Sequence, residues 1–69
     1  MKSKMYKIMF VGQNGIERFA EYVYGVNRKE AFLMSSASGN LKMYCIRKNT
    51  EIFKKILANN PECFYGADF

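Results

Sequence analysis

Residues 9–25 constrain the fold more than any other segment, because their pattern fits both a helix and a β-hairpin. In a helix over residues 15–24, Asn14 would cap the N-terminus, Glu17 would complete a capping box, and apolar residues would recur at helical spacing. In a hairpin, the aromatic and β-branched residues near the end of the segment would form the second strand. The two structures expose different side chains, so the choice decides which surface is available for function.

Strand pairing favours the hairpin. A loop of Gln13, Asn14 and Gly15, with Gly15 in the left-handed conformation of a bulged turn, places residues of like character opposite one another. The expected pairs are Lys7 with Glu21, Met9 with Phe19, Ile8 with Ala20 and Tyr6 with Tyr22. A two-residue Asn-Gly turn shifts this register by one residue and mixes charge into an apolar face. We therefore expect a hairpin, and the helix over residues 15–24 is the alternative.

Three further elements are predicted from their capping residues and their apolar patterns. A short helix begins after Asn27, whose capping-box partner is Glu30, and Gly39 stands at its expected C-cap. The alternating segment 41–48 predicts a strand. The last helix is capped by Asn49 or Thr50 and ends before Pro61, and the expected apolar stripe comprises Ile52, Phe53, Ile56 and Leu57.

These elements predict an α+β fold in a single domain spanning residues 1–69. Their order is ββαβα, with a three-stranded antiparallel sheet of strand order 2-1-3, two helices on one face, and a tail over residues 62–69 that packs on the domain. If residues 15–24 are helical, the order becomes βααβα. A chain of 69 residues has too little material for a second core.

Composition argues against several function classes. The chain has no His, one Asp and five scattered Glu, so general acid-base catalysis is poorly provided for and we expect no enzyme and no cofactor. Cys45 and Cys63 lack the spacing of a zinc site, so no metal is expected and both thiols should be reduced. The apolar run from Ile8 to Val11 is too short for a signal-peptide core, and the expected location is the cytoplasm, with no membrane contact.

One face of the predicted sheet is too apolar for a plain solvent face. Its expected binding residues are Met5, Lys7, Met9, Phe19, Val23, Lys42, Tyr44, Ile46 and Lys48. An exposed apolar patch of this kind marks an interaction site unless the chain covers it, and aromatic residues of the tail are available to do so. A net charge of +5 favours acidic partners. A basic corner for such contacts comprises Arg47, Lys48, Lys54 and Lys55.

The leading hypothesis is a small non-catalytic protein-binding module, a regulator or inhibitor of a larger protein. Its size and its basic, apolar surface are typical of accessory proteins of phages or mobile elements. Self-association into a dimer would be a second way to cover the apolar face. The alternative is a small nucleic-acid-binding domain, in which aromatic side chains stack on bases while lysines contact phosphates.

Overall fold

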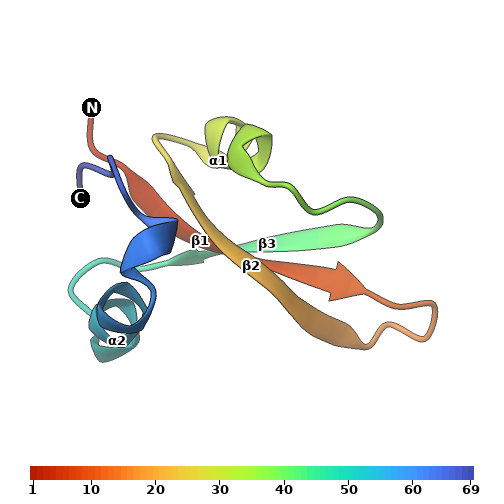
Figure 1. Ribbon diagram of the computed structural model, residues 1–69. Helices are drawn as coiled ribbons and strands as arrows, with labels where there is room; N and C mark the ends of the chain where they lie inside the picture. The colour runs from red at the N-terminus through yellow and green to blue at the C-terminus, as the bar shows by residue number, and fades with distance from the viewer.

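A computed structural model describes all residues from 1 to 69 and shows a three-stranded antiparallel sheet with two helices (Figure 1). The strands are β1 (Lys4–Val11), β2 (Glu17–Gly25) and β3 (Leu41–Ile46), in the order β2-β1-β3. The helices are α1 (Arg28–Met34) and α2 (Glu51–Asn59), and a 3-10 turn, η1 (Pro61–Cys63), follows α2. The α+β class and the strand order 2-1-3 are confirmed. The alternative with residues 15–24 helical is wrong, because β2 occupies residues 17–24 and residues 15 and 16 lie in the loop before it.

The hairpin loop has the predicted three residues, Gln13 to Gly15. The backbone N–H of Gly12 donates to the carbonyl of Ile16 at 2.8 Å, which closes the loop, and Gly15 has a φ of 80°. The side chain of Asn14 accepts from the N–H of Ile16 at 3.2 Å. The left-handed conformation is open to glycine without a Cβ penalty, so this residue sets where the chain reverses.

A β-bulge divides the hairpin into two registers. Met9 pairs with Phe19 as predicted, but the register shifts between Ile8 and Met9, and Ala20 is left without a partner. Beyond the bulge Lys7 lies opposite Tyr22, so the predicted pairs on that side are wrong by one residue. Because side chains alternate along a strand, the bulge moves Val23 to the opposite face and turns Tyr22 and Tyr24 to the face of Met5.

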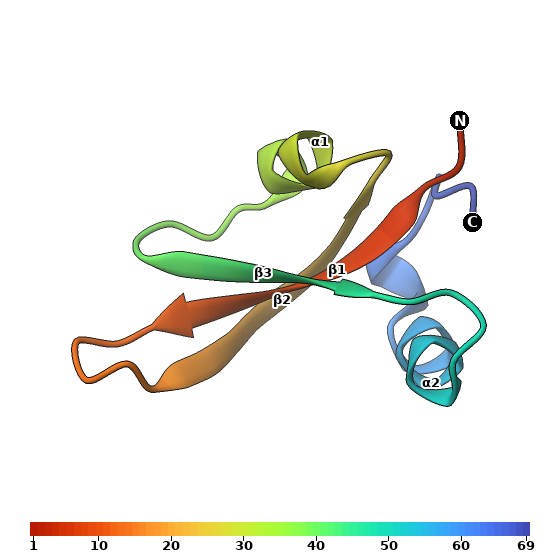
Figure 2. The same ribbon diagram turned by 180° about the vertical axis from the view of Figure 1, so that it is seen from behind.

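The two helices cover opposite faces of the sheet, which corrects the expectation of both on one face (Figures 1 and 2). On one face, Ala31 of α1 packs with Tyr6, Ile8 and Val23. On the other, α2 packs with Met5, the neighbour of Tyr6 in the strand. The bulge places Tyr22 and Tyr24 on the Met5 face. Both faces of the sheet therefore carry apolar side chains, and one helix packs on each.

Helix ends follow the predicted caps at three of four positions. The side chain of Asn27 accepts from the N–H of Glu30 at 2.8 Å, and Thr50 accepts from Phe53 at 3.2 Å. Asn60 ends α2. Helix α1, however, ends at Ser35, four residues before Gly39: Ser35 has an extended backbone, and the serines in this segment compete for backbone hydrogen bonds and so have poor helix propensity.

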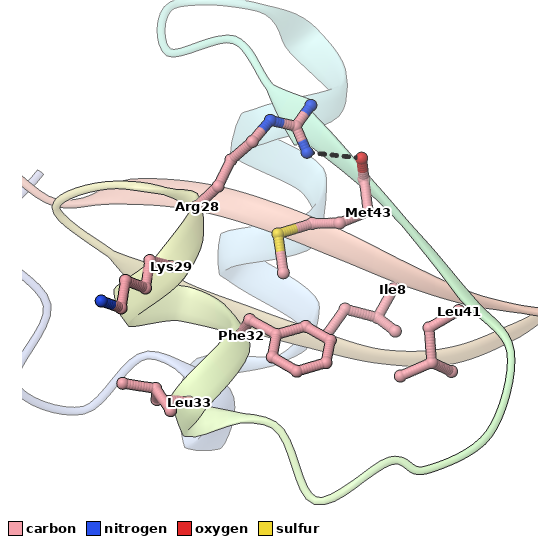
Figure 3. Close-up of a pocket in the computed structure, with 7 residues that line it drawn as sticks. All are labelled: Ile8, Arg28, Lys29, Phe32, Leu33, Leu41 and Met43. Carbon is pink, nitrogen blue, oxygen red and sulfur yellow. Dashed lines mark hydrogen bonds between the residues drawn. The ribbon is translucent and has the colours of Figure 1, made fainter.

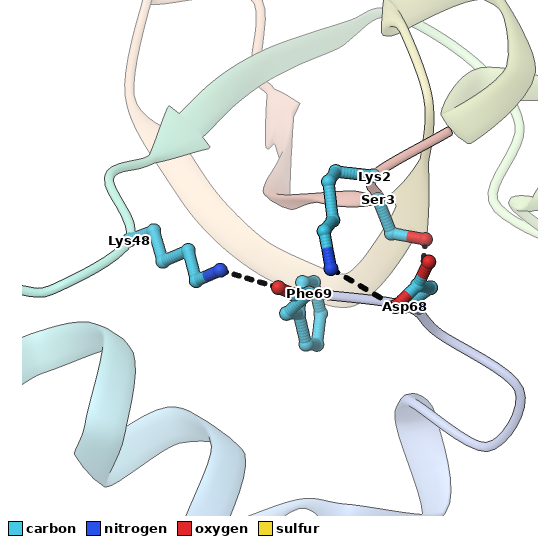
Figure 4. A network of polar contacts seen from close by, with 5 residues as sticks. All are labelled: Lys2, Ser3, Lys48, Asp68 and Phe69. Carbon is cyan, nitrogen blue, oxygen red and sulfur yellow. Dashed lines mark hydrogen bonds and ion pairs between the residues drawn. The ribbon is translucent and has the colours of Figure 1, made fainter.

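The C-terminal residues pack against α2 and the Met5 face. Phe64 is buried, and the ring of Phe69 stands edge-on to Phe53 with centroids 5.0 Å apart. The two ends of the chain are joined by main-chain and side-chain contacts (Figure 4). Ser3 donates its N–H to the carbonyl of Asp68 at 2.7 Å, and the Asp68 N–H donates to the Ser3 Oγ at 3.0 Å.

Candidate functional site

Helix α2 and the tail cover only one end of the Met5 face. The other end, which we call the open sheet surface, comprises Lys7, Met9, Phe19, Lys42 and Tyr44. Phe19 keeps 52% and Tyr44 39% of its surface exposed, whereas Met9 is half-buried. The open sheet surface therefore retains five of the nine residues that the sequence placed on a binding face.

Glu17 organises the polar groups of this surface from the first position of β2. The Tyr44 hydroxyl donates to its Oε1 at 2.6 Å, and the Lys42 Nζ lies 3.6 Å from its Oε2. The ammonium group of Lys7 lies 5.8 Å from the centroid of the Tyr44 ring. The hydrogen bond to Glu17, above all, raises the pKa of Tyr44, and partial burial and the carboxylate charge add to it. These contacts hold the Tyr44 ring in one place.

Four predicted binding residues lie elsewhere. Met5 is fully buried and Val23 is 4% exposed on the opposite face, so neither can contact a partner, and their assignment to the binding surface is wrong. Ile46 is half-buried against α2, and Lys48 donates to the main-chain carbonyl oxygen of Phe69 (Figure 4). The sequence pattern groups them only if both helices lie on the other face and the register of the hairpin continues without a shift at Ala20.

The predicted basic corner divides into two groups. Lys54 and Lys55 are exposed on α2, and Lys54 pairs with Glu51 at 3.9 Å. Arg47 and Lys48 instead line a cleft of about 410 Å³ between the start of β1 and the end of β3. The same cleft is lined by Lys2 and Lys4. The sequence analysis did not join these two lysines to Arg47 and Lys48, although the predicted pairing of β1 with β3 brings the two ends of these strands together.

A groove between α1 and β3 was not predicted. It has a volume of about 490 Å³ and lies on the face opposite the open sheet surface (Figure 3). Its lining residues are Ile8, Arg28, Lys29, Phe32, Leu33, Leu41 and Met43. The only signal in the sequence was the run Phe32, Leu33, Met34, which is too apolar for one buried helix face and leaves all three side chains more than half exposed.

Arg28 crosses one end of this groove. Its Nη1 donates to the main-chain oxygen of Met43 at 2.8 Å, and its guanidinium carbon lies 5.8 Å from the centroid of the Tyr6 ring (Figure 3). Burial raises the pKa of Tyr6, and the charge of Arg28 opposes that rise. Neither Arg28 nor Lys29 forms an ion pair within the chain.

No group of three or more His, Cys, Asp or Glu side chains lies close enough together to hold a metal ion. Neither helix has the length and apolar character needed to cross a bilayer. No protein-family model, curated protein or solved structure matches this chain. The open sheet surface and the groove both present apolar side chains beside cations.

Proposed function

We propose that this protein is a non-catalytic protein-binding module, a regulator or inhibitor of a larger protein, and that it binds through the open sheet surface. The observation that carries the proposal is the exposure of Phe19 and Tyr44 on the end of the sheet that α2 and the tail leave uncovered. Aromatic residues and methionine are enriched in the cores of protein interfaces. Tyr44 is held by Glu17, so little side-chain freedom is lost when a partner packs on it.

The charges around this surface suit an acidic protein partner. Lys7 and Lys42 flank the aromatic rings, and charged residues at an interface rim increase the rate and specificity of association. The carboxylate of Glu17 stands among them and pairs with Lys42, so this surface suits separate carboxylates of a protein, placed beside the lysines, better than the continuous negative charge of a phosphate backbone. A surface that mixes aromatic rings, lysines and a carboxylate supports protein recognition over base stacking.

A nucleic-acid-binding domain is the second candidate, and the basic cleft is the observation that favours it. Lys2, Lys4, Arg47 and Lys48 lie around one opening of the molecule. Fluorescence anisotropy with random single- and double-stranded oligonucleotides tests this alternative at about 50 and 200 mM salt, because phosphate contacts weaken steeply as salt rises. Absence of binding at the lower salt would exclude it.

The protein-binding proposal is tested by affinity capture from the source organism with three immobilised proteins: the wild type, Phe19→Ser and Ile52→Ser. Ile52 is 57% exposed on α2, away from the open sheet surface, and so provides a matched loss of an exposed apolar side chain. We expect one protein to be retained by the wild type and by Ile52→Ser but lost from Phe19→Ser. If every captured protein binds all three equally, the open sheet surface is not the binding site.

A further inference from the structure

One edge of the sheet has unpaired peptide groups. Strand β3 is the last in the order β2-β1-β3 and has no strand on its outer side. The N–H of Val11 donates to the carbonyl of Asn40 at 2.8 Å, so the peptide groups of Asn40 point toward β1. Because the direction alternates along an antiparallel strand, those of Leu41, Met43 and Cys45 point outward. We call these outward groups the free edge of β3.

Two of these residues, Leu41 and Met43, line the groove, and Cys45 lies on the same face of the sheet. The three residues pair with Phe10, Ile8 and Tyr6 of β1, so their side chains lie on the α1 face of the sheet. Leu41 and Met43 form the wall of the groove opposite Phe32 of α1 (Figure 3). A strand added along the free edge of β3 would therefore place every second side chain beside this apolar wall.

The cations of the groove have no carboxylate partner in the chain. Arg28 donates to the outward carbonyl of Met43, where an added strand would place its own N–H. An incoming N–H can replace the guanidinium there and release Arg28 to form a bidentate contact with a carboxylate. Lys29 lies beside it and is also exposed. The groove thus complements an apolar segment that carries an acidic residue.

We propose that an extended, acidic segment of another protein adds to the free edge of β3 as a fourth strand and packs its apolar side chains against Leu41, Met43 and Phe32. Main-chain hydrogen bonds supply affinity in such strand addition, and the side-chain groove supplies specificity. The edge is not blocked: it carries no proline or bulge, and the charged group of Lys42 is held on the other face by Glu17. This surface is distinct from the open sheet surface, so the inference stands independently of the function proposed above.

A second copy of the chain fits this edge less well. Each copy carries a net charge of +5, and two facing β3 edges would bring Arg28 and Lys29 of both copies together. Neither groove offers a carboxylate to the other. An acidic segment of a different protein meets the same edge with attraction instead of repulsion.

The experiment selects binders from a phage-displayed library of random linear peptides. The immobilised wild-type protein is the target, and Cys45→Pro serves for counter-selection. Proline at position 45 removes an outward N–H and leaves the hydrogen bonds to β1 intact, because an edge strand tolerates proline there. Cys45→Val is the matched control, since it changes the same exposed side chain and keeps the N–H.

We expect the selected peptides to alternate apolar residues, to include Asp or Glu, and to bind Cys45→Pro about tenfold more weakly than Cys45→Val. Amide exchange should slow at Leu41, Met43 and Cys45 when peptide binds and remain unchanged at Lys42 and Tyr44, whose N–H groups already face β1. Replacing the acidic residue by its amide should weaken binding to the wild type but not to Arg28→Gln. Methylating alternate backbone nitrogens of the peptide repeats the test without altering the protein's fold.

Two results would overturn the inference. If the library yields no peptide that binds above background, or only peptides that bind Cys45→Pro and Cys45→Val equally, the free edge of β3 is not a binding site. Peptides that are insensitive to Cys45→Pro but lost from Phe19→Ser would refute this inference while leaving the proposed function of the open sheet surface standing.

Discussion

Gly25, the last residue of β2, is required because there is no room for a Cβ at this position, and not because its backbone needs a positive φ. It is absent from the glycines with positive φ, yet a Cβ built on it would lie 2.5 Å from the backbone N and 2.9 Å from the Cα of Ala31 in α1. These distances are far below van der Waals contact, and backbone atoms cannot rotate away as a side chain can. Gly25→Ala must therefore displace α1 from the sheet.

The expected loss in the free energy of unfolding follows from this overlap. Overpacking of a buried site costs about 1–3 kcal/mol, and the upper end applies because the clash is with backbone. The general preference of strands for Ala over Gly returns only about 0.5–1 kcal/mol. We expect a net loss of about 2 kcal/mol from a total stability of about 3–10 kcal/mol for a chain of this length. The midpoint of thermal unfolding should fall by roughly 8–16 °C.

Urea unfolding followed by far-ultraviolet circular dichroism measures this loss. Gly12→Ala is the matched control, because its φ is not positive and its Cβ would come no closer than 3.2 Å to Asn14 Oδ1 and 3.4 Å to the carbonyl oxygen of Ile16, distances that a small shift relieves. That variant should change the free energy of unfolding by less than about 0.5–1 kcal/mol. If Gly25→Ala is as stable as the wild type, the close packing of α1 on the end of β2 is refuted.

Three further perturbations test other parts of the structure. Met5→Ala should cost about 2–5 kcal/mol in urea unfolding, since Met5 is fully buried between the sheet and α2; a loss below 1 kcal/mol would contradict that burial. The pKa of Tyr44 is raised above its usual 10.0, so the protonated Tyr44 stabilises the fold below pH 10 and this contribution declines as the pH rises further. Glu17→Gln should make this decline in the free energy of unfolding smaller, as measured by urea unfolding at a series of pH values. Equal profiles would show that the bond to Glu17 is not formed. Ellman's reagent should modify the exposed Cys45 quickly and Cys63 slowly, because burial, above all, raises the pKa of the Cys63 thiol. Cys45→Val should abolish the fast phase of the reaction.

Local chemistry was readable from the sequence. The loop with Gly15 at its left-handed position, the cap by Asn27 and the cap by Thr50 each depend on residues within four positions of one another. The match of Met9 with Phe19 followed from the loop length. These features led to the correct strand order and to five residues of the open sheet surface.

Interactions between distant segments decided the rest. The bulge at Ala20 exchanges which residues of β2 lie on each face of the sheet, and no turn or cap signal in the sequence marks its position. The side taken by α2, the cleft that joins Lys2 and Lys4 to the end of β3, and the groove beside α1 arise from contacts between segments far apart in the chain. The sequence by itself determined where the chain turns and where its helices begin, because those energies are local. Only the tertiary structure decided which apolar side chains remain exposed, because burial depends on what every other segment covers.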